Sequence, residues 1–306
     1  MQMKTISKAM MIHLSSFLLT LLSILIIIWP ADATTIDDLA LGLPSQHDTI
    51  VHHLGYALGY READEQAAWV LYCLSADEVL AKVGHRRDNF RPDPAVPTGS
   101  ATLADYRGSG LDRGHLAPAA DMAWSQEAMD ESFFMSNMSP QPPAFNRGIW
   151  KELEDQVRSF AVAAGELWVT TGPLLEEGLP HIGASGVSVP RAFYKVLLVL
   201  EPRPRELAFL LPADAGPAPL ERFVLTVDEL ERRSGLDFYP ALPDSLERRL
   251  EATVSTRGWD FGPALAATPA GERLAAAVQC RGITKKGLRC KRLTRSSSGL
   301  CWQHER

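Results

Sequence analysis

Four apolar runs, each of the length of a β-strand, constrain the fold of this chain most strongly. They cover residues 67–73, 166–171, 193–200 and 206–211. A short apolar run bounded by loop residues is typical of a buried strand. Only residues 201–205 separate the last two runs, a connection short enough for antiparallel pairing. The runs therefore predict a sheet with antiparallel neighbours.

Helices are expected between and after these runs. Apolar residues recur at helical spacing over 146–164, and residues 125–134 and 244–255 also have helical patterns. Strands interspersed with helices predict an α/β (α+β) domain of about 240 residues, because the mixed pattern occupies most of the chain. Its central sheet should be mostly antiparallel and flanked by helices.

A capping pattern predicts both ends of one further helix. Thr226 and Glu229 have the spacing of a capping box, which starts a helix. Gly235 follows at the position where a left-handed residue commonly ends one. We therefore expect a short helix between Thr226 and Gly235.

The N-terminal segment 1–33 has the pattern of a signal peptide. Lys4 and Lys8 precede an apolar run from Met10 to Trp29, and small residues follow at Ala31-Asp32-Ala33. We expect cleavage there, export to the periplasm or the medium, and no stable membrane association afterwards. The apolar run is also long enough to span a bilayer, so a membrane anchor at the N-terminus is the alternative.

Net charge excludes one way of binding nucleic acid. The 306 residues include 31 Lys and Arg against 37 Asp and Glu, a net charge of −6. A polycationic coat is therefore ruled out. The charge is uneven, since residues 279–306 hold eight Lys and Arg against one Glu, while residues 34–278 hold 21 basic and 35 acidic residues. An acidic body of this kind must recruit a polyanion through a local cleft.

The segment from Asp105 to Met122 is the most informative for function. Its eighteen residues include one His, two Arg, three Asp and three Gly. His115 stands two residues after Arg113, which places a base that titrates near neutral pH close to a permanent cation. Phosphodiester hydrolysis needs both, a proton acceptor for water and a cation for the developing negative charge. Taken alone, the segment is equally consistent with a Gly-rich turn around a structural His.

Asn146 and Glu154 form a second polar pair. On one continuous helix, eight positions would separate them by about 80° around the axis and about 12 Å along it. Both could not bind one ion directly, so Asn146 is the candidate ligand and Glu154 would act through metal-bound water. Oxygen donors with several waters favour Mg²⁺ over zinc. The alternative is that Asn146 caps the helix and Glu154 is a solvated acid.

These motifs, taken in order, resemble the DNA/RNA non-specific endonuclease family, the ββα-metal nucleases that include endonuclease G-like enzymes. The resemblance rests on Asp112-Arg113-Gly114-His115, on Ser-Asn-Met-Ser-Pro-Gln at 136–141, and on Asn146-x-x-x-Trp150-x-x-x-Glu154. Further matching segments lie at 105–110, 171–174, 189–196 and 221–223. The likeness implies the ββα-metal fold over roughly residues 50–250.

The resemblance also implies roles for individual residues. His115 is expected to be the general base that activates water. Asn146 is expected to be the only direct protein ligand of a single Mg²⁺ (or Mn²⁺). Glu154 would hold metal-bound water and help to protonate the leaving oxygen. Arg113 would stabilise the transition-state phosphate.

Two further assignments are less direct. The family has a second arginine upstream, before an aromatic residue and an Asp, and both Arg86 and Arg87 are candidates. Spacing favours Arg86. Asp112 is expected to orient the backbone or His115 rather than bind the metal.

The C-terminal segment predicts a second metal site. Cys280, Cys290, Cys301 and His304 have the spacing C-x9-C-x10-C-x2-H. Three thiolates and an imidazole suit tetrahedral Zn²⁺, and a segment of this length needs such a metal to fold. A disulfide is the alternative, because export favours oxidation.

Together these observations predict four parts and one activity. The parts are a signal peptide (1–33), a nuclease domain (34–264), a linker (265–279) and a basic Cys3His module (280–306). We expect an exported Mg²⁺-dependent endonuclease with DNA and RNA as substrates, and we allow a homodimer and an inhibitor protein as partners. The alternatives are a catalytically weak nucleic-acid binder and a phosphodiesterase for another extracellular substrate.

Overall fold

The computed structural model describes residues 41–264, 278–284, 287–294, 296, 298–301 and 304. The predicted signal peptide and nearly all of the predicted linker lie outside the described residues. None of the helices within the described ranges has the length and apolar character needed to cross a membrane.

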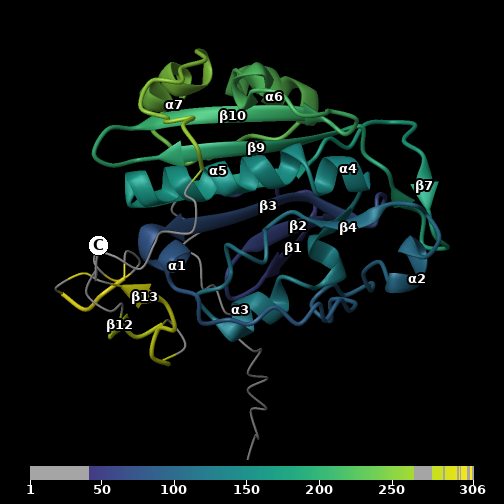
Figure 1. Ribbon diagram of the computed structural model, residues 1–306, viewed down its shortest axis with the longest axis horizontal. Helices are drawn as coiled ribbons and strands as arrows, with labels where there is room; N and C mark the ends of the chain where they lie inside the picture. Colours follow the sequence, from purple (N-terminus) through teal and green to yellow (C-terminus); the bar gives the residue numbers. More distant parts are fainter. Residues whose placement is uncertain are drawn as a thin grey trace, which may run out of the picture. The chain divides into compact units, whose positions relative to one another are not determined.

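One antiparallel sheet forms the centre of the described chain (Figure 1). Each strand pairs antiparallel with its neighbours, as expected. The seven strands, in spatial order, are β1 (Thr49–His52), β2 (Ala57–Arg61), β3 (Gln66–Ser75), β6 (Glu166–Pro173), β9 (Ala192–Val199), β10 (Arg205–Pro212) and β11 (Val224–Leu225).

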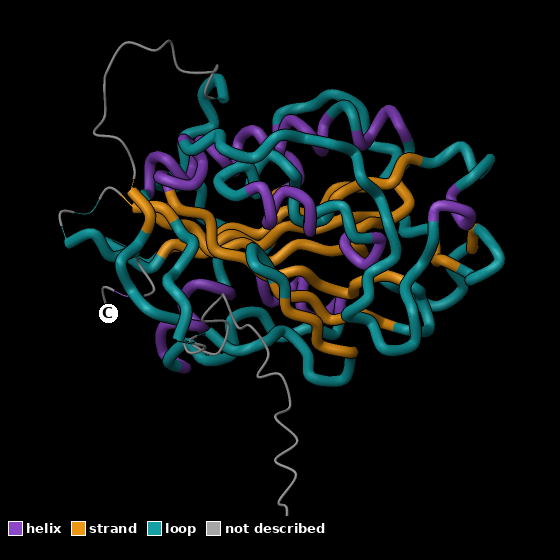
Figure 2. The backbone as a smooth tube through the Cα atoms, turned by 90° about the horizontal axis from the view of Figure 1, so that it is seen from below, coloured by secondary structure: helices purple, strands orange, loops and turns teal. Residues whose placement is uncertain are grey.

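The apolar runs explain the middle of this sheet. The strands β3, β6 and β10 cover three of the predicted runs, and β9 covers the fourth except for its last residue, Leu200. Nearly every residue of β3, β6 and β9 is buried. Both faces of these strands are covered, which requires a continuous apolar run rather than an alternating one. Viewed from below, the strands form a twisted layer with helices on both sides (Figure 2).

Helix α5 (Ile149–Ala164) covers one face of the sheet. An aromatic cluster fixes its first turn, because the Trp150 ring stacks on Phe145 at 5.5 Å and lies 5.7 Å from Phe193 of β9. Lys195 points to the same face as Phe193, since alternate residues of a strand share a face. The side chain of Lys195 therefore lies under α5, with its Nζ 4.5 Å from the Trp150 ring centre.

Helices α6 (Val227–Ser234) and α7 (Asp244–Glu251) lie along β10 (Figure 1). Glu206 pairs with Leu198, and both point away from the α5 face. The capping prediction for α6 is confirmed, since the Thr226 hydroxyl accepts a hydrogen bond from the Glu229 N–H and Gly235 adopts a left-handed conformation. Helix α7 ends at Glu251, four residues earlier than predicted.

A smaller hairpin lies beside the main sheet. Strand β4 (Asp112–His115) pairs antiparallel with β5 (Met138–Gln141), with His115 opposite Met138. Helix α4 (Pro143–Asn146) follows β5 and leads into α5. Two strands followed by a helix give the predicted ββα arrangement. The remaining elements are α1 (Ala76–Leu80), α2 (Leu103–Tyr106), α3 (Gln126–Glu131), η2 (Met135–Asn137), β7 (His181–Ile182), β8 (Val187–Ser188), η3 (Leu220–Phe223), β12 (Val278–Gln279) and β13 (Leu293–Thr294).

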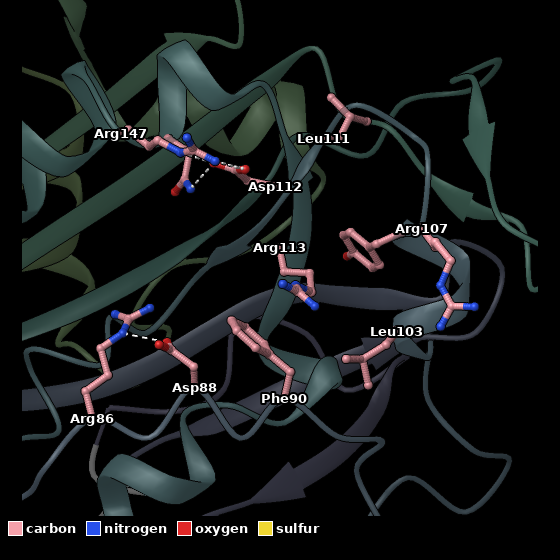
Figure 3. A pocket seen from close by; sticks show the side chains of 11 residues that line it. Arg86, Asp88, Phe90, Leu103, Arg107, Leu111, Asp112, Arg113 and Arg147 are labelled. Atoms are coloured by element: carbon pink, nitrogen blue, oxygen red, sulfur yellow. Dashed lines mark hydrogen bonds and ion pairs between the residues drawn. The ribbon is translucent and has the colours of Figure 1, made fainter.

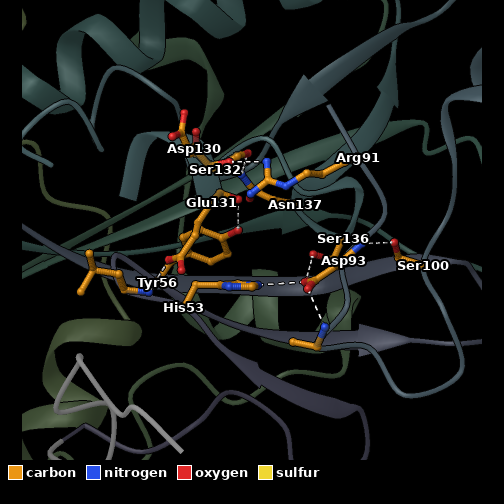
Figure 4. A network of polar contacts seen from close by, with 12 residues as sticks. His53, Tyr56, Arg91, Asp93, Ser100, Asp130, Glu131, Ser132, Ser136 and Asn137 are labelled. Atoms are coloured by element: carbon orange, nitrogen blue, oxygen red, sulfur yellow. Dashed lines mark hydrogen bonds and ion pairs between the residues drawn. The ribbon is translucent and has the colours of Figure 1, made fainter. Parts of the chain in front are cut away.

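A buried polar network holds the loop before α2 in place (Figure 4). The Asp93 carboxylate lies 2.9 Å from His53 Nε2 and accepts a hydrogen bond from Ser136 at 2.5 Å. Burial alone would raise the pKa of Asp93, but these contacts and the Ala95 N–H lower it. The loop, which leads from α1 to α2, is thereby tied to the β1 end and to η2.

Candidate active site

Strand β4 separates its side chains onto two faces. Arg113 and His115 point to one face, whereas Asp112 and Gly114 point to the other, because neighbouring residues of a strand alternate. Gly114 stands opposite Ser139, and a Cβ at Gly114 would collide with the Gln141 side chain. The glycine of this motif therefore lets the two strands and the Gln141 side chain pack together.

His115 is held between aromatic rings. Its imidazole meets Phe133 edge to face at 4.8 Å and lies 5.8 Å from Phe90. Its Nε2 is buried and has no hydrogen-bond partner among the described residues. Burial first, and then the Arg86 cation, lower the pKa of His115 to about 3, with Arg113 acting in the same direction and Asp88 against it. His115 is therefore neutral at physiological pH, and one of its two ring nitrogens can accept a proton.

The turn after His115 is fixed by Asn137. The Asn137 side chain accepts a hydrogen bond from the Ala117 N–H and donates one to the Ala117 carbonyl, both at 2.9 Å. It also donates to the Ser132 carbonyl at 2.8 Å. We predicted no role for Asn137 from sequence, although it lies in the Ser-Asn-Met-Ser-Pro-Gln motif. A buried Asn that bonds one residue in both directions is visible only in the folded structure.

Two arginines approach the same place from different segments. The Arg113 guanidinium carbon lies 4.2 Å from the Phe90 ring centre, and that of Arg86 lies 5.1 Å from Phe133. Arg86 Nε also donates to Asp88 at 2.7 Å. Arg87 points elsewhere and lies 3.8 Å from the Asp130 carboxylate. Of the two upstream candidates, Arg86 is thus the one beside His115.

A cavity of about 760 Å³ opens in front of these residues (Figure 3). Four arginines and two aspartates supply its charge, a net positive balance that suits a polyanion. Phe90, Leu103, Tyr106 and Leu111 supply its apolar walls. The charged residues and the amide that line it are Arg86, Asp88, Arg107, Asp112, Arg113, Asn146 and Arg147.

Asp112 orients Asn146 in this cavity. The Asp112 carboxylate accepts hydrogen bonds from Arg147 at 2.7 and 2.9 Å and from Asn146 Nδ2 at 2.9 Å. Burial alone would raise the pKa of Asp112, but these bonds, above all those from Arg147, lower it. Because Nδ2 donates its hydrogen bond to Asp112, the Oδ1 of Asn146 is the atom that can bind a metal ion. Asp112 thus orients the candidate ligand, whereas we expected it to orient the backbone or His115.

The single helix predicted over 146–164 is wrong at its start. Asn146 is the last residue of α4, and α5 begins only at Ile149. Gly148 separates the two helices with φ −105° and ψ −116°, and a Cβ there would collide with the Ala144 carbonyl oxygen. The angle and distance derived for Asn146 and Glu154 on one helix therefore do not apply.

Glu154 lies in a second group of charges under α5. The charges that most affect it are Lys195, Asp121 and Arg158. Burial raises the pKa of Glu154 and lowers that of Lys195. Lys195 Nζ donates to the Thr171 hydroxyl at 3.1 Å. Lys195 belongs to a segment of the family resemblance, but its contact with this group could not be inferred from spacing.

The C-terminal thiols and imidazole converge on one point. One ligand atom from each of Cys280, Cys290, Cys301 and His304 lies within 4.8 Å of the others. Cys290 Sγ and Cys301 Sγ are 3.8 Å apart, and His304 Nδ1 is 3.4 Å from the sulfurs of Cys280 and Cys301. A tetrahedral Zn²⁺ with bonds of about 2.3 Å to sulfur needs sulfur separations of about 3.8 Å. The four side chains therefore fit zinc. Cys280, Cys290 and Cys301 form no disulfide bond in the structure.

Contacts around this cluster also suit a metal. His304 Nε2 lies 3.2 Å from the Ile283 carbonyl oxygen, which leaves Nδ1 as the ligand nitrogen. The backbone N–H groups of Gly282 and Cys301 donate to Cys280 Sγ at 3.3 and 3.1 Å. The Arg292 side chain from this module pairs with Glu78 of α1, and both are buried.

Comparisons with known proteins identify the family of the chain. A model of the DNA/RNA non-specific endonuclease family matches residues 38–245. Nuclease C1 of Cunninghamella echinulata var. echinulata is 38% identical over 224 residues, which are 67% of this chain and 88% of that protein. Mitochondrial endonuclease G of Homo sapiens is 39% identical over 201 residues, which are 60% of this chain and 67% of that protein.

A solved structure shows the same fold. The crystal structure of the EndoG/EndoGI complex, described by its mechanism of EndoG inhibition, contains a chain with a TM-score of 0.63 and 30% sequence identity. The likeness covers 74% of this chain and 95% of that one. The predicted ββα-metal nuclease fold is confirmed. The chain therefore belongs to the DNA/RNA non-specific endonuclease family and is a hydrolase of phosphodiester bonds in nucleic acid.

Proposed function

We propose that the protein is an exported endonuclease that needs Mg²⁺ (or Mn²⁺), cleaves DNA and RNA without sequence preference, and uses His115 as its general base. The observation that carries this proposal is the buried Nε2 of His115, which has no hydrogen-bond partner among the described residues. The imidazole lies 5.8 Å from Phe90, which lines the cavity with four arginines. A neutral imidazole can accept a proton, and the arginines can bind phosphate. Contacts to phosphates rather than base edges position the strand without reading its sequence.

The proposed reaction assigns one task to each side chain. His115 Nε2 takes a proton from water as the water oxygen bonds to phosphorus. Arg113 and Arg86 stabilise the negative charge that develops on the phosphate oxygens. As the family resemblance implies, Glu154 would hold water at the metal ion and help to protonate the oxygen whose bond to phosphorus breaks.

Asn146 Oδ1 would hold the metal ion, with water and phosphate oxygens at the remaining positions. The fit rests on the donor set, since the bond to Asp112 engages Nδ2 and presents an amide oxygen to the cavity. Such oxygen donors suit Mg²⁺. When bound, the ion supplies positive charge next to the reacting phosphate.

Digestion of supercoiled plasmid and of a structured RNA tests the activity. We expect both to be cleaved with Mg²⁺ and neither with EDTA. Retention of nucleic acid without cleavage would point instead to the weak binder. Cleavage of a small phosphodiester alone would point to the other phosphodiesterase.

The pH dependence of kcat/KM tests the base. Because burial and Arg86 lower the pKa of His115, the acid limb should lie below about pH 6, under the usual value for histidine. Arg86→Gln removes a neighbouring cation, so the pKa should rise and the acid limb should move to higher pH. Arg87→Gln is the matched control, because Arg87 faces Asp130. If the acid limb of kcat/KM moved equally in both variants, it would not reflect the pKa of His115.

We also propose that the C-terminal module binds one Zn²⁺ and helps to hold nucleic acid with its basic residues. The purified chain should contain one zinc per molecule, and Cys301→Ser should remove it, because three ligands bind zinc far more weakly than four. Cys73→Ala is the control, since Cys73 lies in β3. Zinc content near zero, with only two titratable thiols, would establish the disulfide instead.

Export and partners remain predictions that need their own measurements. Mass spectrometry of the secreted protein should find an N-terminus close to Thr34, and a start at Met1 would indicate the anchor. The EndoG structure named above is a complex with EndoGI. By analogy, we propose that an inhibitor protein would cover the arginine-lined cavity. The homodimer stays a prediction.

A further inference from the structure

Three acidic side chains meet on the face of the sheet opposite α5, and a fourth, on β10, points to the same face and is affected by their charges. Glu206 comes from β10, Asp228 and Glu231 from α6, and Glu251 from α7. One carboxylate oxygen from each of Asp228, Glu231 and Glu251 lies within 4.8 Å of the other two. The two helices and the strand lie next to one another in Figure 1. None of these four residues takes part in the nuclease chemistry proposed above.

Glu206 is buried under this group without a hydrogen-bond partner. Its side chain belongs to a residue that is 5% exposed, and neither of its carboxylate oxygens has a partner among the described residues. Glu251 is 6% exposed, and its Oε1 also lacks one there. Buried polar atoms are nearly always paired, and a buried carboxylate without a partner is costly. These oxygens therefore indicate a ligand.

The charged groups that most affect Glu206 and Glu251 include no cation. The charges with the largest effects on Glu206 and Glu251 are all acidic, from α6, α7 and the segment between them. Burial, and then these acids, raise the pKa of Glu251 to about 8. Arg205 points to the opposite face, with its guanidinium carbon 5.0 Å from the Trp259 ring centre. On α6, Arg232 and Arg233 pair with Glu229 instead.

The geometry and the ligand type agree on one class of ion. Two oxygens bound to the same Ca²⁺, each at about 2.3–2.6 Å, are at most about 5 Å apart, as observed for Asp228, Glu231 and Glu251. An all-carboxylate set without His or Cys favours a hard cation, and ligands from three elements suit the irregular shell of Ca²⁺ better than the octahedron of Mg²⁺. Asp228 is exposed, which gives the ion a path from solvent.

We propose that Asp228, Glu231 and Glu251, with Glu206 beneath them, form a Ca²⁺ site that ties α6 and α7 to the outer face of β10. The ion would neutralise the repelling carboxylates and give the buried oxygens of Glu206 and Glu251 a partner. Its effect is on stability rather than on the chemistry at His115.

Thermal unfolding and titration calorimetry of the full chain test this site. At a Ca²⁺ concentration about 100 times Kd, the Tm of the native sequence at pH 8 should rise by about 5–10 °C. Glu251→Gln should abolish both this rise and the heat of Ca²⁺ binding. Without Ca²⁺ the same variant should melt at a higher temperature than the native sequence, because one repelling charge is gone.

Three further variants make the result specific. Glu231→Gln should also abolish the rise in Tm and the heat of Ca²⁺ binding. Because Glu231 is less buried than Glu251, this variant provides the test if Glu251→Gln does not fold. Asp214→Asn, an exposed acid outside the cluster, should keep the full rise in Tm. Asn146→Ala should also keep it, which separates this site from the one proposed for Mg²⁺. The proposal is wrong if the native sequence shows no heat of binding, or if Glu251→Gln and Glu231→Gln keep the same rise.

Discussion

Replacing His115 by alanine should lower kcat/KM for plasmid cleavage by at least about 10²–10⁴-fold. The substitution removes the buried Nε2, which has no hydrogen-bond partner among the described residues. The ring that carries it lies 5.8 Å from Phe90, a residue of the cavity wall. Without it, water must lose its proton to solvent. Initial rates of nicking, measured at saturating Mg²⁺ and at several pH values, give the size of the loss.

The fold should survive this change. His115 contributes ring contacts to Phe133 and Phe90 but lies at the end of a four-residue strand outside the central sheet. Circular dichroism and the Tm should therefore change little compared with the loss of activity. His181→Ala, at an exposed histidine, is the matched control and should cleave normally. A His115→Ala enzyme of normal rate would refute the assignment of the general base.

Replacing Asn146 by alanine should reduce cleavage by at least about 10²-fold, because it removes the proposed ligand of an ion whose charge stabilises the transition state. A ligand role further predicts that half-maximal activity requires a higher Mg²⁺ concentration. A purely structural role, through the bond to Asp112, would lower kcat without that shift. Cleavage measured over a Mg²⁺ series separates the two effects.

Two controls complete this experiment. Glu152→Gln changes an exposed residue of α5 and should leave the Mg²⁺ dependence as it is. EDTA should abolish cleavage by the native sequence, but it also removes zinc from the C-terminal module. Cys301→Ser, which retains Asn146, should still respond to added Mg²⁺. Full activity of Asn146→Ala at low Mg²⁺ would contradict the ligand assignment.

The middle of the sheet and the ends of α6 could be predicted from sequence because their signals are local. A run such as 67–73 is apolar on every residue, and only a strand covered on both faces buries all of it. Thr226 and Gly235 act through contacts within a few residues of each helix end. Strands β1 and β2 were not predicted, because their short segments become strands only by pairing with each other and with β3.

The site divides in the same way. His115, Arg113 and Asn146 could be chosen because their residue types and their order match one chemistry and one family. Their surroundings could not be derived. The helix that spacing predicted through Asn146 is interrupted at Gly148, and Asp112 bonds Asn146 rather than His115. Both outcomes depend on contacts between segments that are distant in sequence.

By itself, the sequence determined the family, the strands of the central sheet and the candidate residues of the site. The tertiary structure decided which upstream arginine lies beside His115, how Asn146 is oriented, and where the acids of α6 and α7 gather over Glu206 of β10. The physical reason is range. Strand and cap preferences act over a few neighbouring residues, whereas the surroundings of His115 and the repulsion around Glu251 arise only when remote side chains are packed out of water.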